Sequence, residues 1–299
     1  MMHRDGPRPN LFIIGAAKSG TTSLHYYLDA HPEVCMSSVK EPGYFVPEIT
    51  AFPKDEAWYR GLFAGADGAK VIGESSTHYS KLPIYQGVPE RIARFNPDAR
   101  FIYLMRDPID RAISQYWHHV KQRAEHRPIL TAMKREVRYT AFSDYKMQLT
   151  PYFDLFGRDR VLLLTFEQLA ADPARVMDRV LRWLGVDPTA GPTEFEVRNA
   201  RPEALLKPKG RGLMTRFQHS RFWATVAPYV PKRWREAATR ALALEPVRPA
   251  AEPIDEVVEF LRPGQLEKVQ ELSAFLGREF PEWTTVHGGT LPSLAAATA

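Results

Sequence analysis

The stretch LFIIGAAKSGTTSL, residues 11–24, decides the fold of this chain. Residues 11–16 form a short apolar run of the kind found in buried strands. A turn of small residues follows, and hydroxyl side chains then open a helix whose apolar positions Leu24, Tyr27 and Leu28 recur at helical spacing. A strand, a turn and a helix start in this order are typical of a phosphate-binding loop, because backbone N–H groups converge there.

The lysine of this loop is displaced from the position that a nucleoside triphosphate requires. A Walker A loop places lysine directly after its last glycine, where it reaches the β- and γ-phosphates. Here Lys18 precedes Gly20 by two residues and Thr21 follows the glycine, which argues against a P-loop nucleotide kinase. We still expect the loop to bind an anion through N–H groups, hydroxyls and the lysine. The residues assigned to it are Lys18, Ser19, Gly20, Thr21, Thr22 and Ser23.

A second motif, YLMRDPIDRAISQY at residues 103–116, predicts a second anion clamp. Arg106 ends a predicted strand at 99–108, and Ser114 lies eight residues later on a helix predicted from Asp110 to about Gln122. Eight residues are about two helical turns, so both side chains share one region near the helix start. The alternative is an ordinary Arg-Asp-Pro helix cap. Two clamps at neighbouring strand ends predict a ligand with two separate phosphates.

The pattern of strands and helices indicates an α/β protein. Further apolar runs at 70–76 and 160–169 predict strands, and Asp172, Pro173 and Gly185 mark the start and end of a helix. Apolar strands that alternate with helices favour a parallel sheet covered on both faces. We therefore predict a P-loop-like three-layer sandwich with a central, mainly parallel sheet, as a single domain over residues 1–299. Ligands of such sheets bind at the carboxyl ends of the strands.

Charge is unevenly distributed along the 299 residues, whose formal net charge is +5. Residues 198–240 hold eleven Lys/Arg and two Asp/Glu, a net +9, and the remainder is −4. This indicates a local anionic partner rather than nucleic acid, although a solvated basic face has the same composition. We expect a helical basic and aromatic excursion or lid at about 212–252, whose residues 212–240 could contact a membrane surface.

Composition also limits the chemistry and the compartment. Cys35 is the only cysteine, which excludes an internal disulfide framework and a multi-cysteine metal site. There is no apolar run of about 18 residues and no apolar signal core near the N-terminus. We expect a cytoplasmic protein without a metal. The sequence leaves the oligomeric state open.

At these motifs the chain resembles sulfotransferases that use 3′-phosphoadenylyl sulfate (PAPS). GAAKSGTTSL resembles their 5′-phosphosulfate loop, and RDPIDRAISQY is similar to their 3′-phosphate motif. The resemblance continues through KEPGYF (40–45), GESSTHY (73–79), RVLLLTFEQLAADP (160–173) and the segment 261–283, and is nearest to heparan-sulfate sulfotransferases and their bacterial relatives. It implies PAPS as donor, adenosine 3′,5′-bisphosphate as product and no metal. It also places Lys18 on the bridging oxygen of the leaving phosphate.

The resemblance further implies the acid–base and acceptor residues. Glu41, between Lys40 and Pro42, matches the glutamate base of the heparan-type enzymes, although an exposed Lys-Glu turn would look the same. The segment 74–79 resembles a loop that contacts the acceptor, here through Ser76 and His78. Two positions depart from the family pattern, because Gly43 replaces a histidine and Ser75 replaces a lysine. His78 is the alternative base, or an ordinary polar loop residue.

Another cofactor contact is implied in KPKGRG, residues 207–212. Lys209, Gly210 and Arg211 resemble a loop that closes over the 3′-phosphate, and the alternative is a basic linker. The resulting hypothesis is transfer of a sulfuryl group to a hydroxyl or amine of a glycan, glycolipid or small molecule. A non-catalytic nucleotide- or glycan-binding relative is the other alternative. Such a relative would be expected to lack Lys18 or the base, and both Lys18 and Glu41 are present.

Overall fold

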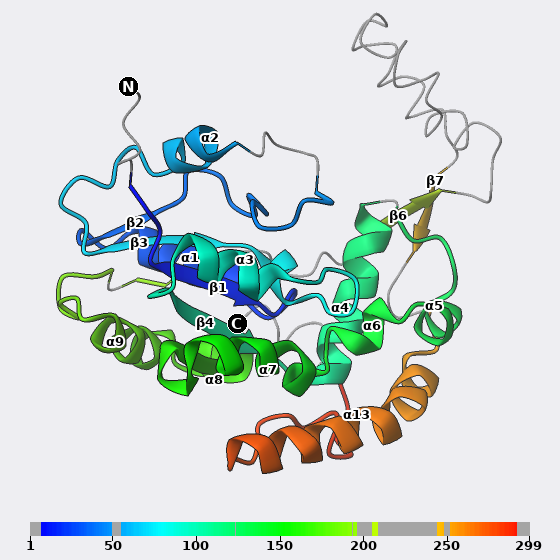
Figure 1. The fold of residues 1–299 in the computed structure, drawn as a ribbon. Coiled ribbons are helices and arrows are strands. Elements are labelled where there is room, and N and C mark those ends of the chain that lie inside the picture. The colour runs from blue at the N-terminus through cyan, green and yellow to red at the C-terminus, as the bar shows by residue number, and fades with distance from the viewer. Residues whose placement is uncertain are drawn as a thin grey trace, which may run out of the picture.

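The computed structural model is organised around a five-stranded sheet (Figure 1). It describes residues 7–49, 55–122, 124–192, 194–195, 205–208, 244–247 and 252–291. Every pair of neighbouring strands in this sheet is parallel. In spatial order the strands are β2 (Val34–Met36), β3 (Val71–Ser75), β1 (Leu11–Gly15), β4 (Arg100–Met105) and β5 (Val161–Thr165).

The side chains of the central strand alternate between two separate cores. Leu11 and Ile13 pack into one core with α1 (Thr21–Asp29) and α9 (Pro173–Leu184). Phe12 and Ile14 pack into the other, larger core. Successive strand residues point to opposite faces, so apolar residues at every position require helices on both sides of the sheet. The predicted three-layer sandwich is therefore confirmed.

The helices that cover the Phe12 face of the sheet come from widely separated parts of the chain. They are α3 (Val88–Phe95), α4 (Pro108–Lys121), α7 (Tyr145–Phe156) and α13 (Ile254–Leu276). Shorter elements connect or extend the layers. They are α2 (Glu56–Gly61), η1 (Thr77–Ser80), α5 (Ile129–Arg135), α6 (Arg138–Ala141), η2 (Arg158–Arg160) and α8 (Phe166–Ala171).

Local boundaries follow from capping residues. Asp172 caps α9 by accepting a hydrogen bond from the Arg175 amide, and Gly185 ends the helix at φ 76°, both as predicted. The strands predicted at 99–108 and 160–169 are shorter than expected. Asp107 accepts from the first turn of α4, and Thr165 accepts from the Gln168 amide to start α8, so each strand ends where a helix cap begins.

Two elements differ from the sequence predictions. Cys35 lies on the edge strand β2, a strand of three residues for which the sequence carried no prediction. In the segment predicted to be a helical excursion at 212–252, residues Leu244–Val247 form strand β7, which pairs antiparallel with β6 (Leu205–Pro208) beside α4. Lys209, Gly210, Arg211 and the rest of the basic segment lie outside the described residues. The single-domain assignment stays a prediction.

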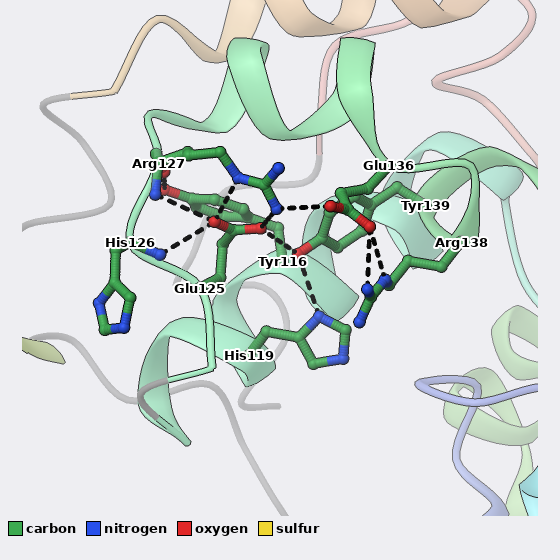
Figure 2. A network of polar contacts seen from close by, with 8 residues as sticks. All are labelled: Tyr116, His119, Glu125, His126, Arg127, Glu136, Arg138 and Tyr139. Atoms are coloured by element: carbon green, nitrogen blue, oxygen red, sulfur yellow. Dashed lines mark hydrogen bonds and ion pairs between the residues drawn. The ribbon is translucent and has the colours of Figure 1, made fainter. Parts of the chain in front are cut away.

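A polar network fixes the segment after α4 (Figure 2). The nearly buried Glu125 carboxylate accepts hydrogen bonds from the Arg127 guanidinium at 2.7 and 2.9 Å and from the Tyr139 hydroxyl at 3.2 Å. Arg127 also pairs with Glu136 at 2.9 Å. His119 Nδ1 lies 3.0 Å from the Tyr139 hydroxyl, which ties the end of α4 to α6.

Over the described residues, none of the helices combines the length and the apolar character that crossing a bilayer demands.

Candidate active site

The phosphate-binding loop connects the carboxyl end of β1 to α1. Lys18 at φ 72° and Gly20 at φ 89° turn the chain into the helix. The N-cap residue Gly20 has no side chain with which to bond the N–H groups of the first turn, and a helix start of this kind favours an anion. Position 20 also favours glycine for a steric reason, because a Cβ there would lie 3.1 Å from the ring of Phe166. Ser19 is fully buried and Thr21 and Ser23 nearly so.

Arg106 reaches the same loop from the end of β4. Its Nη1 donates a hydrogen bond to the backbone carbonyl of Lys18 at 3.2 Å, so the two predicted clamps are physically joined. Its guanidinium also lies 4.6 Å from the centroid of the Phe166 ring, a stacking distance, and 3.9 Å from Asp110. Ser114 lies two turns along α4 and is partly exposed.

The backbone around Arg106 is held by residues that the sequence did not single out. The Tyr145 hydroxyl donates to the Arg106 carbonyl at 2.6 Å and lies 3.3 Å from its amide. Glu167 accepts from the Asp107 amide at 2.9 Å. The strand register explains the second contact, because Met105 and Thr165 are paired and the residues that follow them leave the sheet side by side. In the sequence, only an expected pairing of β4 with β5 could have indicated the contact between Glu167 and Asp107.

Glu41 carries a carboxylate whose two oxygens are both engaged. Lys40 Nζ lies 2.9 Å from Oε1, while the Thr77 amide and hydroxyl donate to Oε2 at 2.8 and 3.1 Å. His78 Nδ1 lies 3.3 Å from Oε2. Burial by itself would raise the pKa of Glu41, but His78 and Lys40 outweigh it and hold that pKa well below its usual range. The structure thus brings Lys40, Glu41 and His78 together.

A second carboxylate, Glu74, is connected to the Glu41 loop through Ser76. It is fully buried and accepts hydrogen bonds from the hydroxyls of Tyr59, Tyr79 and Ser76. Burial raises the pKa of Glu74 to about 7. Ser76 Oγ also accepts from the Gly43 amide at 3.0 Å, and Ser76 itself is fully buried. The Ser76 hydroxyl thus connects Glu74 to the Glu41 loop, and its contact with an acceptor stays a prediction.

Further cations surround Glu41. Burial lowers the pKa of Lys81 to about 8, against the opposing charge of nearby Glu41. Burial, with the charges of Lys18 and Lys81, lowers the pKa of His118 to about 4. His118, on α4, therefore lies near Lys18 and Lys81. Lys81 carried no motif, and only its place after the 74–79 loop could have indicated it. The cations Lys40 and Lys81 suit a polyanionic ligand that lies next to Glu41, the proton acceptor.

In the described segments, no three or more His, Cys, Asp or Glu side chains gather in a way that could hold a metal ion.

Comparison with known proteins identifies the family. Residues 8–206 match the sulfotransferase domain family, which is more than half of the chain. The chain belongs to the sulfotransferase family. The predicted resemblance is confirmed, and this assignment replaces the nucleotide kinase alternative. Both clamps, the Glu41 loop and strand β5 fall within the matched residues.

Individual relatives agree with this assignment. Heparan sulfate glucosamine 3-O-sulfotransferase 3B1 of Mus musculus is 29% identical over 188 residues, covering 60% of this chain and 46% of that protein. Mouse bifunctional heparan sulfate N-deacetylase/N-sulfotransferase 4 is 28% identical over 206 residues, covering 60% and 22%. The match thus spans less than half of either relative. The crystal structure of a sulfotransferase from Alicyclobacillus acidocaldarius superimposes with a TM-score of 0.66 at 26% identity, covering 93% of this chain and 99% of that one.

Proposed function

We propose that this protein transfers a sulfuryl group from PAPS to a hydroxyl or amine of an acceptor. The observation that carries the proposal is the hydrogen bond between Arg106 and the Lys18 carbonyl, because it joins two anion clamps at neighbouring strand ends. A donor with a 5′-phosphosulfate and a 3′-phosphate has one group for each clamp. The 5′ group fits the loop from Lys18 to Ser23, and the 3′-phosphate fits Arg106 and Ser114. Lys209, Gly210 and Arg211 are proposed as additional contacts.

In this proposal Lys18 stabilises the leaving group. The acceptor oxygen or nitrogen attacks sulfur in line, and the bond between sulfur and the bridging oxygen breaks. Negative charge then gathers on the 5′-phosphate of adenosine 3′,5′-bisphosphate. The Lys18 ammonium and the N–H groups at the start of α1 offset this charge without any proton transfer. The cationic clamps supply the counter-charge, so the proposal includes no metal.

Glu41 is proposed as the group that accepts the acceptor's proton. A carboxylate with a low pKa is a weak base, so we place proton transfer late, after bond formation to sulfur has made the acceptor proton acidic. Lys40 and Thr77 keep Glu41 oriented through the contacts at 2.8–3.1 Å. His78, at 3.3 Å, is the alternative base.

The acceptor is proposed to be a glycan, a glycolipid or a small molecule. Lys40 and Lys81 near Glu41 favour an acceptor that carries negative charge of its own. The relatives named for heparan sulfate are consistent with an acidic glycan. The absence of a lysine at Ser75, which instead bonds His25 inside the protein, argues for fewer acceptor sulfates than in those enzymes.

Calorimetric titration with adenosine 3′,5′-bisphosphate, beside ATP with Mg²⁺, tests the function. We expect the bisphosphate to bind wild type and the surface control Arg182→Ala alike, and to bind Arg106→Ala at least tenfold more weakly. ATP should give little response. Preferential binding of ATP with Mg²⁺ would overturn the donor assignment. Turnover of PAPS then separates an enzyme from a non-catalytic relative, which would bind the bisphosphate and form no sulfated product.

A further inference from the structure

The segment that connects α6 to α7 bonds the backbone around Arg106 at two points. The Tyr145 hydroxyl donates to the Arg106 carbonyl at 2.6 Å and lies 3.3 Å from the Arg106 amide nitrogen. The Ser143 hydroxyl donates to the Pro108 carbonyl at 2.9 Å. Ser143 and Tyr145 are only 3% and 2% exposed. The turn from β4 into α4 is therefore bonded on both sides of Asp107 to one buried segment.

Arg111, on α4, fixes the direction of the Ser143 hydroxyl. Its Nε donates to Ser143 Oγ at 2.5 Å, and its Nη2 donates to the Tyr139 carbonyl at 2.7 Å. A guanidinium has donors only, so the single proton of Ser143 points away from Arg111 and toward the Pro108 carbonyl. Tyr139 also belongs to the polar network around Glu125, so Arg111 connects that network to the β4–α4 turn (Figure 2).

Packing alone does not account for an arginine at position 111. The side chain is fully buried, and the two hydrogen bonds described above go to neutral oxygens. Burying a cation is costly, and well-packed apolar side chains of similar volume are often as stable or more stable at such sites. The arginine is better explained by the groups that its hydrogen bonds hold in place.

The Arg106 side chain, which extends from this turn, has a donor left for a ligand. Its Nη1 donates to the Lys18 carbonyl at 3.2 Å, and its Nη2 lies 3.9 Å from Asp110 Oδ2. Its Nε is buried and has no hydrogen-bond partner within the described segments. A buried N–H without a partner is unfavourable, so an anion that accepts from it gains affinity. The direction of this N–H depends on the backbone that Tyr145 and Ser143 hold.

We propose that Ser143 and Tyr145 are positioning residues for the 3′-phosphate, and that Arg111 acts through Ser143. This inference rests on the proposed function, in which Arg106 binds that phosphate. The two hydroxyls keep the Arg106 backbone in one orientation, so its guanidinium is preorganised for the phosphate. The loop that starts at Lys18 offers its own N–H groups to the 5′ group. Loss of either hydroxyl should therefore weaken recognition of the 3′-phosphate selectively.

The test compares the affinities for adenosine 3′,5′-bisphosphate and adenosine 5′-phosphate, each measured by calorimetric titration. Their ratio isolates the 3′-phosphate, because the two nucleotides are otherwise the same. For wild type we expect the bisphosphate to bind about tenfold or more tightly, as hydrogen bonds to a charged group allow. Tyr145→Phe and Ser143→Ala should each lower this ratio about threefold or more and leave the affinity for the 5′-phosphate within about twofold of wild type.

Tyr152→Phe is the matched control. Tyr152 lies on the same helix, is 1% exposed and donates its hydroxyl to the Tyr79 carbonyl at 2.8 Å. The substitution removes the same chemical group as Tyr145→Phe, so we expect a similar loss of stability in thermal unfolding with the wild-type affinity ratio retained. An equal fall in the ratio for both tyrosine variants would indicate a general loss of structure and overturn the inference.

A double variant tests the role of Arg111. Arg111→Met should lower the affinity ratio about as much as Ser143→Ala, and the double variant should lower it no further, because both changes act through one hydroxyl. Independent, additive losses overturn the role of Arg111. If Arg111→Met fails to fold, Ser143→Ala and Tyr145→Phe decide. An unchanged ratio in both, or equal weakening of the two nucleotides, overturns the inference, whereas a wild type without preference for the bisphosphate overturns the proposed function.

Discussion

At the scale of single residues, we expect Lys18 to contribute more to the rate of sulfuryl transfer than to the affinity for the bisphosphate. In the proposed reaction its ammonium meets the negative charge only as that charge develops on the bridging oxygen. We expect Lys18→Ala to lower kcat by about 10²- to 10³-fold, in the range of lost oxyanion stabilisation, with a smaller effect on bisphosphate affinity. Single-turnover rates and calorimetry on the same protein check this. Equal losses in rate and affinity would contradict it and make Lys18 a simple anion contact.

Glu41 and His78 differ in what their removal should do. Glu41→Gln keeps the shape and the Thr77 contacts but removes the charge, so we expect normal bisphosphate binding and a loss of turnover of about 10²-fold or more. His78→Gln should reduce turnover less. Steady-state rates of both variants with one acceptor provide the measurement. The opposite order, with Glu41→Gln fully active, would transfer the role of base to His78.

At the scale of elements, Gly20 connects the loop to helix α1 in a left-handed conformation. Gly20→Ala would place a Cβ 3.1 Å from Phe166 at φ 89°. We expect a loss of about 1–2 kcal/mol in stability together with at least tenfold weaker bisphosphate binding. Gly185 is the matched control, because its φ is 76° and no atom lies within 4 Å of an added Cβ. Gly185→Ala should lose similar stability in thermal unfolding and keep its affinity.

The strands and loops around the candidate site show which features could be predicted from the sequence and which could not. Strands β1 and β4 and the loop after β1 were predictable because contiguous apolar residues end in small or polar ones. Tyr145 and Glu167 were not, since their contacts to Arg106 and Asp107 join segments 39 and 60 residues apart. Ser76 illustrates a second limit, which concerns the orientation of a side chain within a predicted loop. Its loop was identified correctly, but only the fold shows that its hydroxyl faces the buried Glu74.

At the scale of the whole molecule, Glu74 makes stability depend on pH. Its pKa is about 7 in the folded protein, above the ordinary value of 4.5, so the folded state binds the extra proton. The resulting stabilisation is fully present below about pH 4.5 and is lost as pH rises through 7. Urea unfolding at pH 5 and pH 8 should show a fall for wild type that is smaller in Glu74→Gln by up to about 3 kcal/mol.

Glu279→Gln, at an exposed site, should retain the full wild-type fall. The slope in Glu74→Gln should shrink without vanishing, because Glu167 has a pKa of about 7 and contributes with the same sign. An unchanged slope in Glu74→Gln would mean that the three hydroxyl donors keep this carboxylate ionised at neutral pH.

Phe166 touches both of the proposed anion clamps. Its ring lies against Gly20 on the loop and stacks on the Arg106 guanidinium at 4.6 Å. In the proposed donor site, this ring therefore contacts both Arg106, assigned to the 3′-phosphate, and the loop assigned to the 5′ group. The protein should accordingly distinguish nucleotides by the separation of their phosphates more than by their number, and reject a 2′,5′-bisphosphate that carries the same charge as the 3′,5′ isomer.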